Sequence, residues 1–347
     1  MKRHGNLWDK VIDMDNLRRA FTLAATGKKN RDEVKVIADN IEYHLTKLRQ
    51  MLIDGTFHTS KYTTRIIHEP KERIIYILPF YPDRIVHHAI MNILEPIFER
   101  WFIHDSYSCR TNKGPHKGST KCMKYVTRYK WCLKCDISKF YPTINHDIMK
   151  KILKHKFKDH KLLNLVFDII DSIDGDVNLP IGNYISQWLG NLYLNQLDMF
   201  VKHKLHFKPY IRYCDDFCLF ANSKQELLIA GAQIYKFVCD KLLQKFSKWD
   251  IFKTSRGVDF LGYRHFSNGK ILVRKSTVKR LKIYAKETIY MLTHGLISCD
   301  QARSKIASVV GCICHANSHN LYEKLHIEQI RGFIDDYERG IEAPSIF

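Results

Sequence analysis

The chain has 347 residues, 45% of them hydrophobic, and its 56 Lys and Arg outnumber 36 Asp and Glu to give a formal net charge of +20. This length allows one large domain or two to three small ones, and the composition excludes a disordered chain. The charge favours an anionic partner, nucleic acid or a membrane surface, over a generally solvated basic surface. Because the apolar runs are too short to span a bilayer and the N-terminal stretch lacks the apolar core of a signal peptide, we expect a cytoplasmic protein with reduced cysteines that binds nucleic acid and no membrane.

The first 130 residues predict a mainly helical region with one hairpin. Residues 1–60 are basic and have helical periodicity, which Gly27 interrupts and Gly55 ends. The elements predicted after them are two strands over 61–80 around a turn at HEPKE, a helix over 82–100, a loop over 105–121 because of its Gly114, Pro115 and Gly118, and a helix over about 117–129.

The remaining residues predict an α+β arrangement in which helices cover one face of a mainly antiparallel sheet. Asn145 and Ser186 are suitable N-caps for two of the helices, and Ser298 to Gln301 match a capping box. The predicted elements are a strand over 131–135, helices over 146–157 and 186–204, a strand–turn–strand over 210–220, a helix over 224–246, a short strand over 248–253, the segment VDFLGYRHF and basic helices from 275 onward.

Two clusters contain the residue types that bind zinc, and for both we favour core cysteines over a metal site. Cys132 and Cys135 form a C-x-x-C on a predicted strand, where residues three apart point to opposite faces. The second cluster lies in a helix-like stretch and lacks the acidic residue of an H-E-x-x-H site. Its members are Cys312, Cys314, His315 and His319.

Three aspartates point to a metal-dependent reaction. Asp136 ends a predicted strand, and Asp215 and Asp216 lie side by side in the turn of an apolar hairpin, YIRYCDDFCLF. If both elements pair in one sheet, three like charges meet at one edge, which is unfavourable unless a cation binds them. Oxygen ligands suit Mg²⁺, and two such ions roughly 4 Å apart can hold the attacking and leaving oxygens of a phosphoryl transfer. An exposed Asp-rich turn is the alternative, which the apolar flanks weaken.

Five motifs in this order make the chain resemble reverse transcriptases. They are DSYSCR, CDISKFYPTI, LPIGNYISQ, YCDDF and FLGYR, and the resemblance covers about residues 60–325. It implies an α+β right-hand polymerase with an antiparallel palm sheet. The implied domains are fingers over 1–130 with an N-terminal helical extension over about 1–60, a palm over 131–265 with a fingers insertion over about 160–185, and a helical thumb over 266–347.

The resemblance also implies a role for each matched residue. Asp136, Asp215 and Asp216 would be catalytic and, with the Ile137 carbonyl, would bind two Mg²⁺ ions, which Mn²⁺ can replace. The residues implied to contact the incoming dNTP are Lys71, Arg73, Arg110, Phe140, Tyr141, Ile181 and Gly182. Those implied to contact template or primer are Ser186, Gln187, Tyr213, Leu261, Gly262 and Tyr263. Tyr141 matches the ring that excludes a ribose 2′-hydroxyl, the alternative being a core aromatic beside Pro142.

Within reverse transcriptases, the details resemble the enzymes of diversity-generating retroelements. The resemblance rests on Ser186-Gln187, VDFLGYR, DSYSCRTNKGPHKG, VGCICHANSH and above all Ile181, where most reverse transcriptases have a Gln that donates hydrogen bonds. It implies misincorporation opposite template adenines because Ile cannot donate such bonds. It also implies as partners a template RNA, an RNA/cDNA duplex, dNTPs and an accessory variability protein, a basic helical bundle, in a bacterial or phage-derived system.

Two other interpretations remain. A retron or phage-defence reverse transcriptase would share the fold and the aspartates but is less compatible with Ile181 and the Ser-Gln pair. A catalytically idle RNA-binding scaffold would be expected to have lost one of the three aspartates or Tyr141, the ring that excludes the 2′-hydroxyl. All four residues are present. The sequence therefore predicts an RNA-directed DNA polymerase whose fidelity depends on one aliphatic side chain.

Overall fold

The computed structural model describes residues 3–68 and 72–341, and it divides the chain into two compact units. The first comprises Met1–Asn112, Cys135–Phe217 and Leu228–Trp249; the second comprises Lys113–Lys134, Cys218–Leu227 and Asp250–Phe347. Each unit therefore contains segments that are distant in the sequence. The described residues combine helices with three separate sheets, as the α+β prediction expected.

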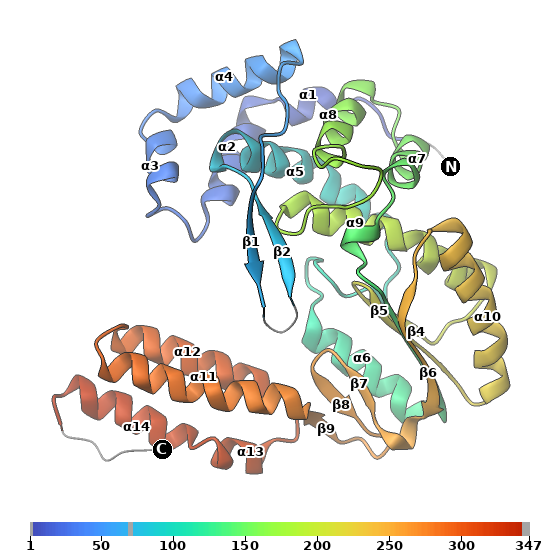
Figure 1. The fold of residues 1–347 in the computed structure, drawn as a ribbon, viewed down its shortest axis with the longest axis vertical. Coiled ribbons are helices and arrows are strands. Elements are labelled where there is room, and N and C mark those ends of the chain that lie inside the picture. Colours follow the sequence, from blue (N-terminus) through green and yellow to red (C-terminus); the bar gives the residue numbers. More distant parts are fainter. Residues whose placement is uncertain (1–2, 69–71, 342–347) are drawn as a thin grey trace. The chain divides into compact units, whose positions relative to one another are not determined.

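Helices dominate the N-terminal part of the first unit (Figure 1). They begin and end where local signals predict: the Asp13 carboxylate caps one helix by accepting from the Asp15 and Asn16 amides, and Gly55 ends another at φ 69°. The elements are α1 (Trp8–Val11), α2 (Met14–Ala25), α3 (Asp32–Ala38), α4 (Ile41–Asp54), a short π-helical turn η1 (Phe80–Arg84) and α5 (Ile85–Trp101). Helix α2 packs on α5.

A two-stranded hairpin follows α4, as predicted. Strands β1 (Thr63–Ile67) and β2 (Arg73–Ile77) pair antiparallel, with Thr63 opposite Ile77 and Ile67 opposite Arg73. The predicted turn between them includes Lys71, which lies outside the described residues. Arg73 is thus the first residue of β2, on the side of the predicted turn.

A four-stranded sheet carries the motifs of the sequence. Its order is β4-β5-β3-β6, formed by Tyr210–Tyr213, Asp216–Ala221, Trp131–Ile137 and Phe246–Lys253. The helices of this part of the chain are η2 (Tyr141–Thr143), α7 (His146–Lys156), α8 (His160–Ile170), α9 (Tyr184–Met199), η3 (Phe200–Lys204) and α10 (Lys224–Lys241). Most of α9 is buried, including Trp188, Leu189 and Tyr193. The prediction that the Asp136 strand and the Asp-Asp hairpin share one sheet is confirmed.

The second unit contains a small sheet and a helical module at the C-terminal end. Its elements are α6 (Pro115–Arg128), η4 (Thr254–Arg256), β7 (Val258–Phe260), β8 (Tyr263–His265), β9 (Ile271–Val273), α11 (Lys275–Thr293), α12 (Cys299–Ile313), α13 (His319–Lys324) and α14 (Ile327–Glu338). Buried residues of α11, α12 and α14, such as Leu281, Ile306 and Ile330, form one apolar core. The predicted capping box at Ser298 and Gln301 is present.

Several predicted boundaries are wrong because tertiary packing overrides local signals. Ser186 is not an N-cap: α9 begins at Tyr184 after Asn183, and Ser186 is buried inside the helix. Gly118 does not prevent regular structure but lies buried within α6, which Pro115 starts. Helix α10 ends at Lys241, not 246, because Phe246 already belongs to β6.

The two cysteine-rich clusters are also clarified. Cys132 and Cys135 are both fully buried in β3, which agrees with core residues. Cys312 and Cys314 are exposed, so the prediction of core cysteines is wrong for the second cluster, which lies at the end of α12. His315 and His319 do not share a helix face, since α12 ends at Ile313 and α13 begins at His319. Within the described ranges, no helix combines the length and apolar composition needed to cross a bilayer.

Candidate active site

The two adjacent aspartates lie where β4 turns into β5. Cys214, the residue before them, has φ 53°, a left-handed conformation that is uncommon for a residue with a side chain. Asp215 follows in the turn, and Asp216 is the first residue of β5. Asp136 lies near the end of β3, the strand beside β5. The sheet therefore brings the three predicted catalytic residues to neighbouring strands of the first unit.

The carboxylates of this turn are electrostatically coupled. Burial raises the pKa of Asp215 above its usual value, the negative charge of Asp136 raises it further, and the positive charge of Arg73 lowers it. Asp136 has a partner of its own, since its Oδ1 accepts a hydrogen bond of 2.6 Å from the Ser247 hydroxyl of β6. Arg73, predicted from its place at the tip of the β1–β2 hairpin, thus acts electrostatically on the same turn.

The carboxylates are not gathered into a ready metal cage. No group of three or more His, Cys, Asp or Glu side chains converges closely enough to hold a metal ion among residues 3–68 and 72–341. The oxygen donors nonetheless suit a hard cation, because Asp136 and Asp215 already repel each other at the end of adjacent strands. The sheet therefore brings the strands of the three aspartates together as predicted, but their side chains are not arranged around one point.

Tyr141 lies directly beside the aspartate turn. Its hydroxyl is 3.7 Å from the Cys214 sulfur, within hydrogen-bonding distance for sulfur. Burial, and then the neighbouring Cys214 thiol, raise the pKa of Tyr141. The ring also packs against α9, where a β-carbon added at Gly190 would lie 3.1 Å from Tyr141 Cε1. Phe140 is buried beneath and meets the Tyr141 ring edge to face, with ring centroids 5.2 Å apart.

A tight turn places Ile181 between Tyr141 and the hairpin strand β2. The Ile181 carbonyl accepts a 2.7 Å hydrogen bond from the Tyr76 amide, and the Leu179 amide donates to the Tyr141 carbonyl at 2.9 Å. Gly182 has φ 122°, and a β-carbon there would lie 2.4 Å from the Tyr76 carbonyl oxygen. Glycine is required at this position by both its backbone conformation and this close approach. The turn therefore connects the strand of Arg73 to the backbone of Tyr141.

Other predicted residues are distributed differently. Ser186 is buried inside α9, Gln187 is exposed, and Tyr213 is half-buried at the end of β4. Leu261, Gly262 and Tyr263 belong to the second unit, where they form the turn between β7 and β8 and the start of β8. The Tyr263 hydroxyl donates to the Cys312 carbonyl and pairs with His116 at 3.1 Å. For all six residues a contact with template or primer stays a prediction.

Arg110 occupies a structural network of its own. Its side chain is 5% exposed and forms an ion pair of 2.7 Å with Glu99. It also donates to the carbonyls of Ile103 and Ser106 at 2.6 and 2.9 Å. These bonds engage the guanidinium inside the protein, which weighs against the predicted contact with a nucleotide.

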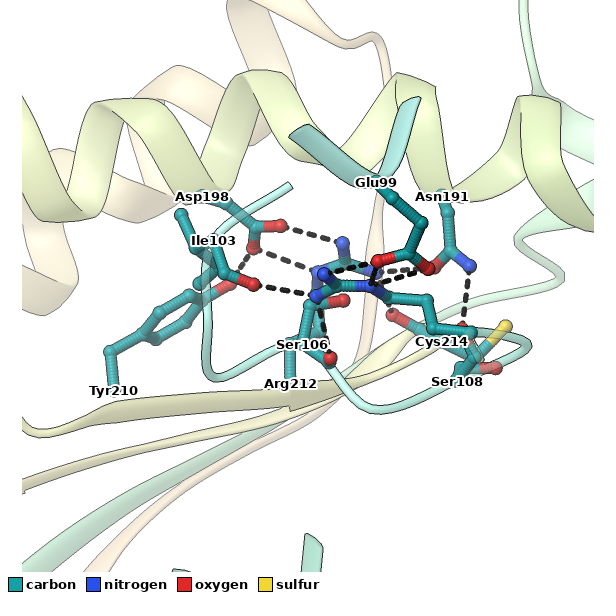
Figure 2. Close-up of polar contacts among 10 residues, drawn as sticks. Glu99, Ile103, Ser106, Ser108, Asn191, Asp198, Tyr210, Arg212 and Cys214 are labelled. Carbon is teal, nitrogen blue, oxygen red and sulfur yellow. Dashed lines mark hydrogen bonds and ion pairs between the residues drawn. The ribbon is translucent and has the colours of Figure 1, made fainter. Parts of the chain in front are cut away.

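Sequence reasoning missed a second arginine, Arg212. It is fully buried in β4, and it pairs with Asp198 of α9 while donating to Asn191 and to the Cys214 carbonyl (Figure 2). The signal was present in the motif YIRYCDDF, because a charged residue inside an apolar strand requires a buried partner. Ser247 was also missed, and nothing in its local sequence distinguishes it from a surface serine.

Comparison with known proteins identifies the family. The model of the family described as reverse transcriptase (RNA-dependent DNA polymerase) matches residues 68–265, more than half of the chain. The chain belongs to the reverse transcriptase family. The matched segment contains the three aspartates, Tyr141 and Ile181. This reverse transcriptase is accordingly an RNA-directed DNA polymerase, an enzyme class that uses an RNA template and dNTPs.

Individual relatives of this reverse transcriptase are distant. Protein YkfC of Escherichia coli (strain K12) is 26% identical over 270 residues, covering 62% of this chain and 70% of that protein. Group II intron-encoded protein LtrA of Lactococcus lactis subsp. cremoris is 25% identical over 172 residues, 46% of this chain and 28% of LtrA. Nuclear intron maturase 1, mitochondrial, of Arabidopsis thaliana is 32% identical over 88 residues, 25% and 12% of the two chains. The matches therefore span far less than two thirds of LtrA and of the intron maturase.

Proposed function

We propose that this reverse transcriptase copies a template RNA into cDNA with frequent misincorporation opposite adenine, as the polymerase of a diversity-generating retroelement. The observation that carries the proposal is Ile181. It sits in the turn held by the Tyr76 amide and adjoins, through Leu179, the backbone of Tyr141. Its half-buried aliphatic side chain has no group that could hydrogen-bond to a nucleotide. Polar contacts at this position discriminate strongly against incorrect substrates, so their absence relaxes selection.

The proposed roles of the other residues follow from their chemistry. Asp136, Asp215, Asp216 and the Ile137 carbonyl would hold Mg²⁺, or Mn²⁺ in its place, since oxygen atoms are the ligands that these ions prefer. When bound, the ions supply activation of the primer 3′-hydroxyl and charge neutralisation of the triphosphate. Arg73 adds positive charge near the aspartate turn, where its planar fork can pair with two phosphate oxygens. The Tyr141 ring leaves no room for a 2′-hydroxyl and so selects dNTPs.

The proposal extends to the architecture and the partners. Residues 1–130, 131–265 and 266–347 would be fingers, palm and thumb of a right-hand polymerase. The exposed basic residues of α11, among them Lys279, Lys282 and Lys286, would contact the phosphates of the RNA/cDNA duplex. An accessory variability protein, a basic helical bundle, would be the further partner.

Primer extension tests the proposed function. The purified chain, Mg²⁺ and dNTPs are combined with a DNA primer on an RNA template rich in adenine, and the cDNA is sequenced. We expect errors concentrated opposite adenine and fewer of them in Ile181→Gln. The matched control is Ile229→Gln on α10, where Ile229 is 55% exposed and the change should leave the error rate unaltered.

Each outcome has a distinct meaning. Faithful copying of adenines by the unaltered chain would overturn the retroelement assignment and favour a retron or phage-defence enzyme. An unchanged error rate in Ile181→Gln would remove Ile181 as the cause. Absence of extension under all conditions, with the accessory protein and its RNA included, would contradict polymerisation by this chain.

A further inference from the structure

Among the described residues of the first unit, the most completely buried cation lies two residues before the aspartate turn. Arg212 has no exposed side-chain surface, and neither has its partner Asp198. A guanidinium taken out of water is strongly unfavourable unless hydrogen bonds and an opposite charge satisfy it. Arg212 Nε and Nη2 donate to the two Asp198 carboxylate oxygens at 2.8 and 2.6 Å, the paired geometry that only arginine can form.

The remaining nitrogen of this guanidinium connects the ion pair to the turn. Arg212 Nη1 donates to Asn191 Oδ1 at 3.1 Å and to the Cys214 carbonyl oxygen at 3.0 Å (Figure 2). That carbonyl belongs to the peptide bond between Cys214 and Asp215. Because Cys214 is in the left-handed conformation, the turn needs support from its surroundings to keep this peptide in one orientation.

The groups that hold Arg212 are themselves held. The Tyr210 hydroxyl donates to Asp198 Oδ1 at 2.8 Å, and Asn191 Nδ2 donates to the Ser108 carbonyl at 2.8 Å. The Arg212 amide donates to the Asp105 carbonyl at 3.0 Å, and its carbonyl accepts from the Tyr107 amide at 3.0 Å. Helix α9, strand β4 and the segment 105–108 therefore act together on one guanidinium.

We propose that Arg212 is a positioning residue for the metal-binding turn. It orients the Cys214–Asp215 peptide through the Cys214 carbonyl and thereby sets the direction of the Asp215 carboxylate, while Asp198 and Asn191 hold the guanidinium in place. The proposal rests on the proposed function in one respect, namely that Asp215 is a metal ligand. Residues that orient metal ligands commonly change metal affinity by about 10- to 100-fold when they are removed.

The test must separate positioning from stability. Removing one partner of a buried ion pair leaves an uncompensated charge, so Arg212→Met alone or Asp198→Leu alone should unfold at a much lower temperature. Replacing both with apolar residues of similar size often restores stability. The double variant Arg212→Met/Asp198→Leu therefore keeps the packing but lacks the donor to the Cys214 carbonyl.

Two measurements are made on the full chain. Mn²⁺ affinity is measured without substrates by electron paramagnetic resonance titration, and the Mg²⁺ concentration for half-maximal primer extension is measured separately. We expect the double variant to unfold near the temperature of the unaltered chain yet to bind Mn²⁺ about tenfold more weakly and to need correspondingly more Mg²⁺. Tyr193→Phe removes a buried hydroxyl that donates to the Leu242 carbonyl and contacts neither Asp198 nor Arg212, so it should leave Mn²⁺ affinity unchanged.

Recovery of stability together with unaltered Mn²⁺ affinity and Mg²⁺ requirement would overturn the proposal and leave Arg212 as a structural residue. If the double variant does not fold, Arg212→Lys serves instead. Its single ammonium keeps the charge but cannot reach both Asp198 and the Cys214 carbonyl in the same geometry, so weaker Mn²⁺ binding is again expected and unaltered binding again overturns the proposal. Asp215→Asn separates the proposed function from the proposal for Arg212. If this variant binds Mn²⁺ as tightly as the unaltered chain, Asp215 is not a metal ligand and the proposed function is contradicted at this residue.

Discussion

Replacing Gly190 with alanine should disturb nucleotide binding from inside the helix that supports Tyr141. A β-carbon at this position would lie 3.1 Å from Tyr141 Cε1, 3.3 Å from the Tyr141 hydroxyl oxygen and 3.3 Å from Phe140 Cε1. Carbon atoms normally approach to about 3.5–4.0 Å, so the Tyr141 ring must move by a few tenths of an ångström. The Tyr141 hydroxyl also contacts the Cys214 sulfur, so we expect the displacement to reach the aspartate turn as well.

The magnitude follows from two opposing terms. Overfilling a packed site costs about 1–3 kcal/mol, and alanine is better than glycine inside a helix by about 1 kcal/mol. The net destabilisation of Gly190→Ala is therefore about 0–2 kcal/mol, and the protein should remain folded. If a strain of about 1.4 kcal/mol falls on the nucleotide site, the KM for dNTP rises about tenfold.

Steady-state single-nucleotide extension with Gly190→Ala measures this effect. The matched control is Gly311→Ala in α12, where nothing lies within 4 Å of the added carbon; it should gain up to about 1 kcal/mol of stability with an unchanged KM. Tyr141→Ala should admit ribonucleotides and abolish the effect of Gly190→Ala in a double-mutant cycle. A KM for dNTP that Gly190→Ala leaves unchanged would refute the reasoning, because it would mean that the Tyr141 ring is not wedged between α9 and the site.

Three further predictions concern other parts of the chain. Ser247→Ala removes the hydroxyl that donates to Asp136 and should raise the Mg²⁺ concentration needed for extension by up to about tenfold. Ser247→Thr keeps a hydroxyl and should leave that concentration unchanged. Equal Mg²⁺ requirements in the two variants would contradict a role of the hydroxyl. Gly182→Ala places a carbon 2.4 Å from the Tyr76 carbonyl oxygen in a residue with φ 122°. The variant should therefore unfold at a lower temperature and have a higher KM for dNTP. An unfolding curve that matches the unaltered chain would argue against the close approach. Burial lowers the pKa of His265 from 6.5 to about 4, so the unfolded state binds the proton first and stability declines as pH falls from about 6.5 toward 4, by up to about 3 kcal/mol. Chemical denaturation at pH 7 and 4.5 measures this loss, and a loss of the same size in His265→Gln would exclude His265 as its source.

Local chemistry accounts for the elements that the sequence predicted correctly. Asn145 caps α7 by accepting from the Ile148 amide, and Ser298 with Gln301 forms the predicted capping box, because each signal acts within four residues. The strand containing Asp136 and the hairpin before and after Asp215 were recognisable from their apolar, β-prone residues. Predicted helix boundaries were wrong where burial decided them. Ser186 offered a local cap, but α9 begins before it at Tyr184, and Ser186 is buried together with Ile185 and Trp188.

The site divides in the same way. The residues that we propose as metal ligands and as the nucleotide-selecting ring, Asp136, Asp215, Asp216 and Tyr141, were visible in the sequence because these roles require particular residue types in a particular order. The groups that support them were not visible, since hydrogen bonds between residues far apart in the chain leave no local pattern. Ser247 reaches Asp136 across 111 positions.

The sequence by itself indicated a basic reverse transcriptase with all three aspartates that we propose as catalytic, because that chemistry depends on residue identity. Only the tertiary structure decided how the aspartate turn is held. Arg110, expected at the nucleotide, is instead bound to Glu99 inside the protein, and Arg212, which the sequence analysis left without a role, reaches the carbonyl before Asp215. A buried arginine takes its role from the partners that folding brings to it, and those partners, Asp198 and Asn191, lie on a different element of the fold.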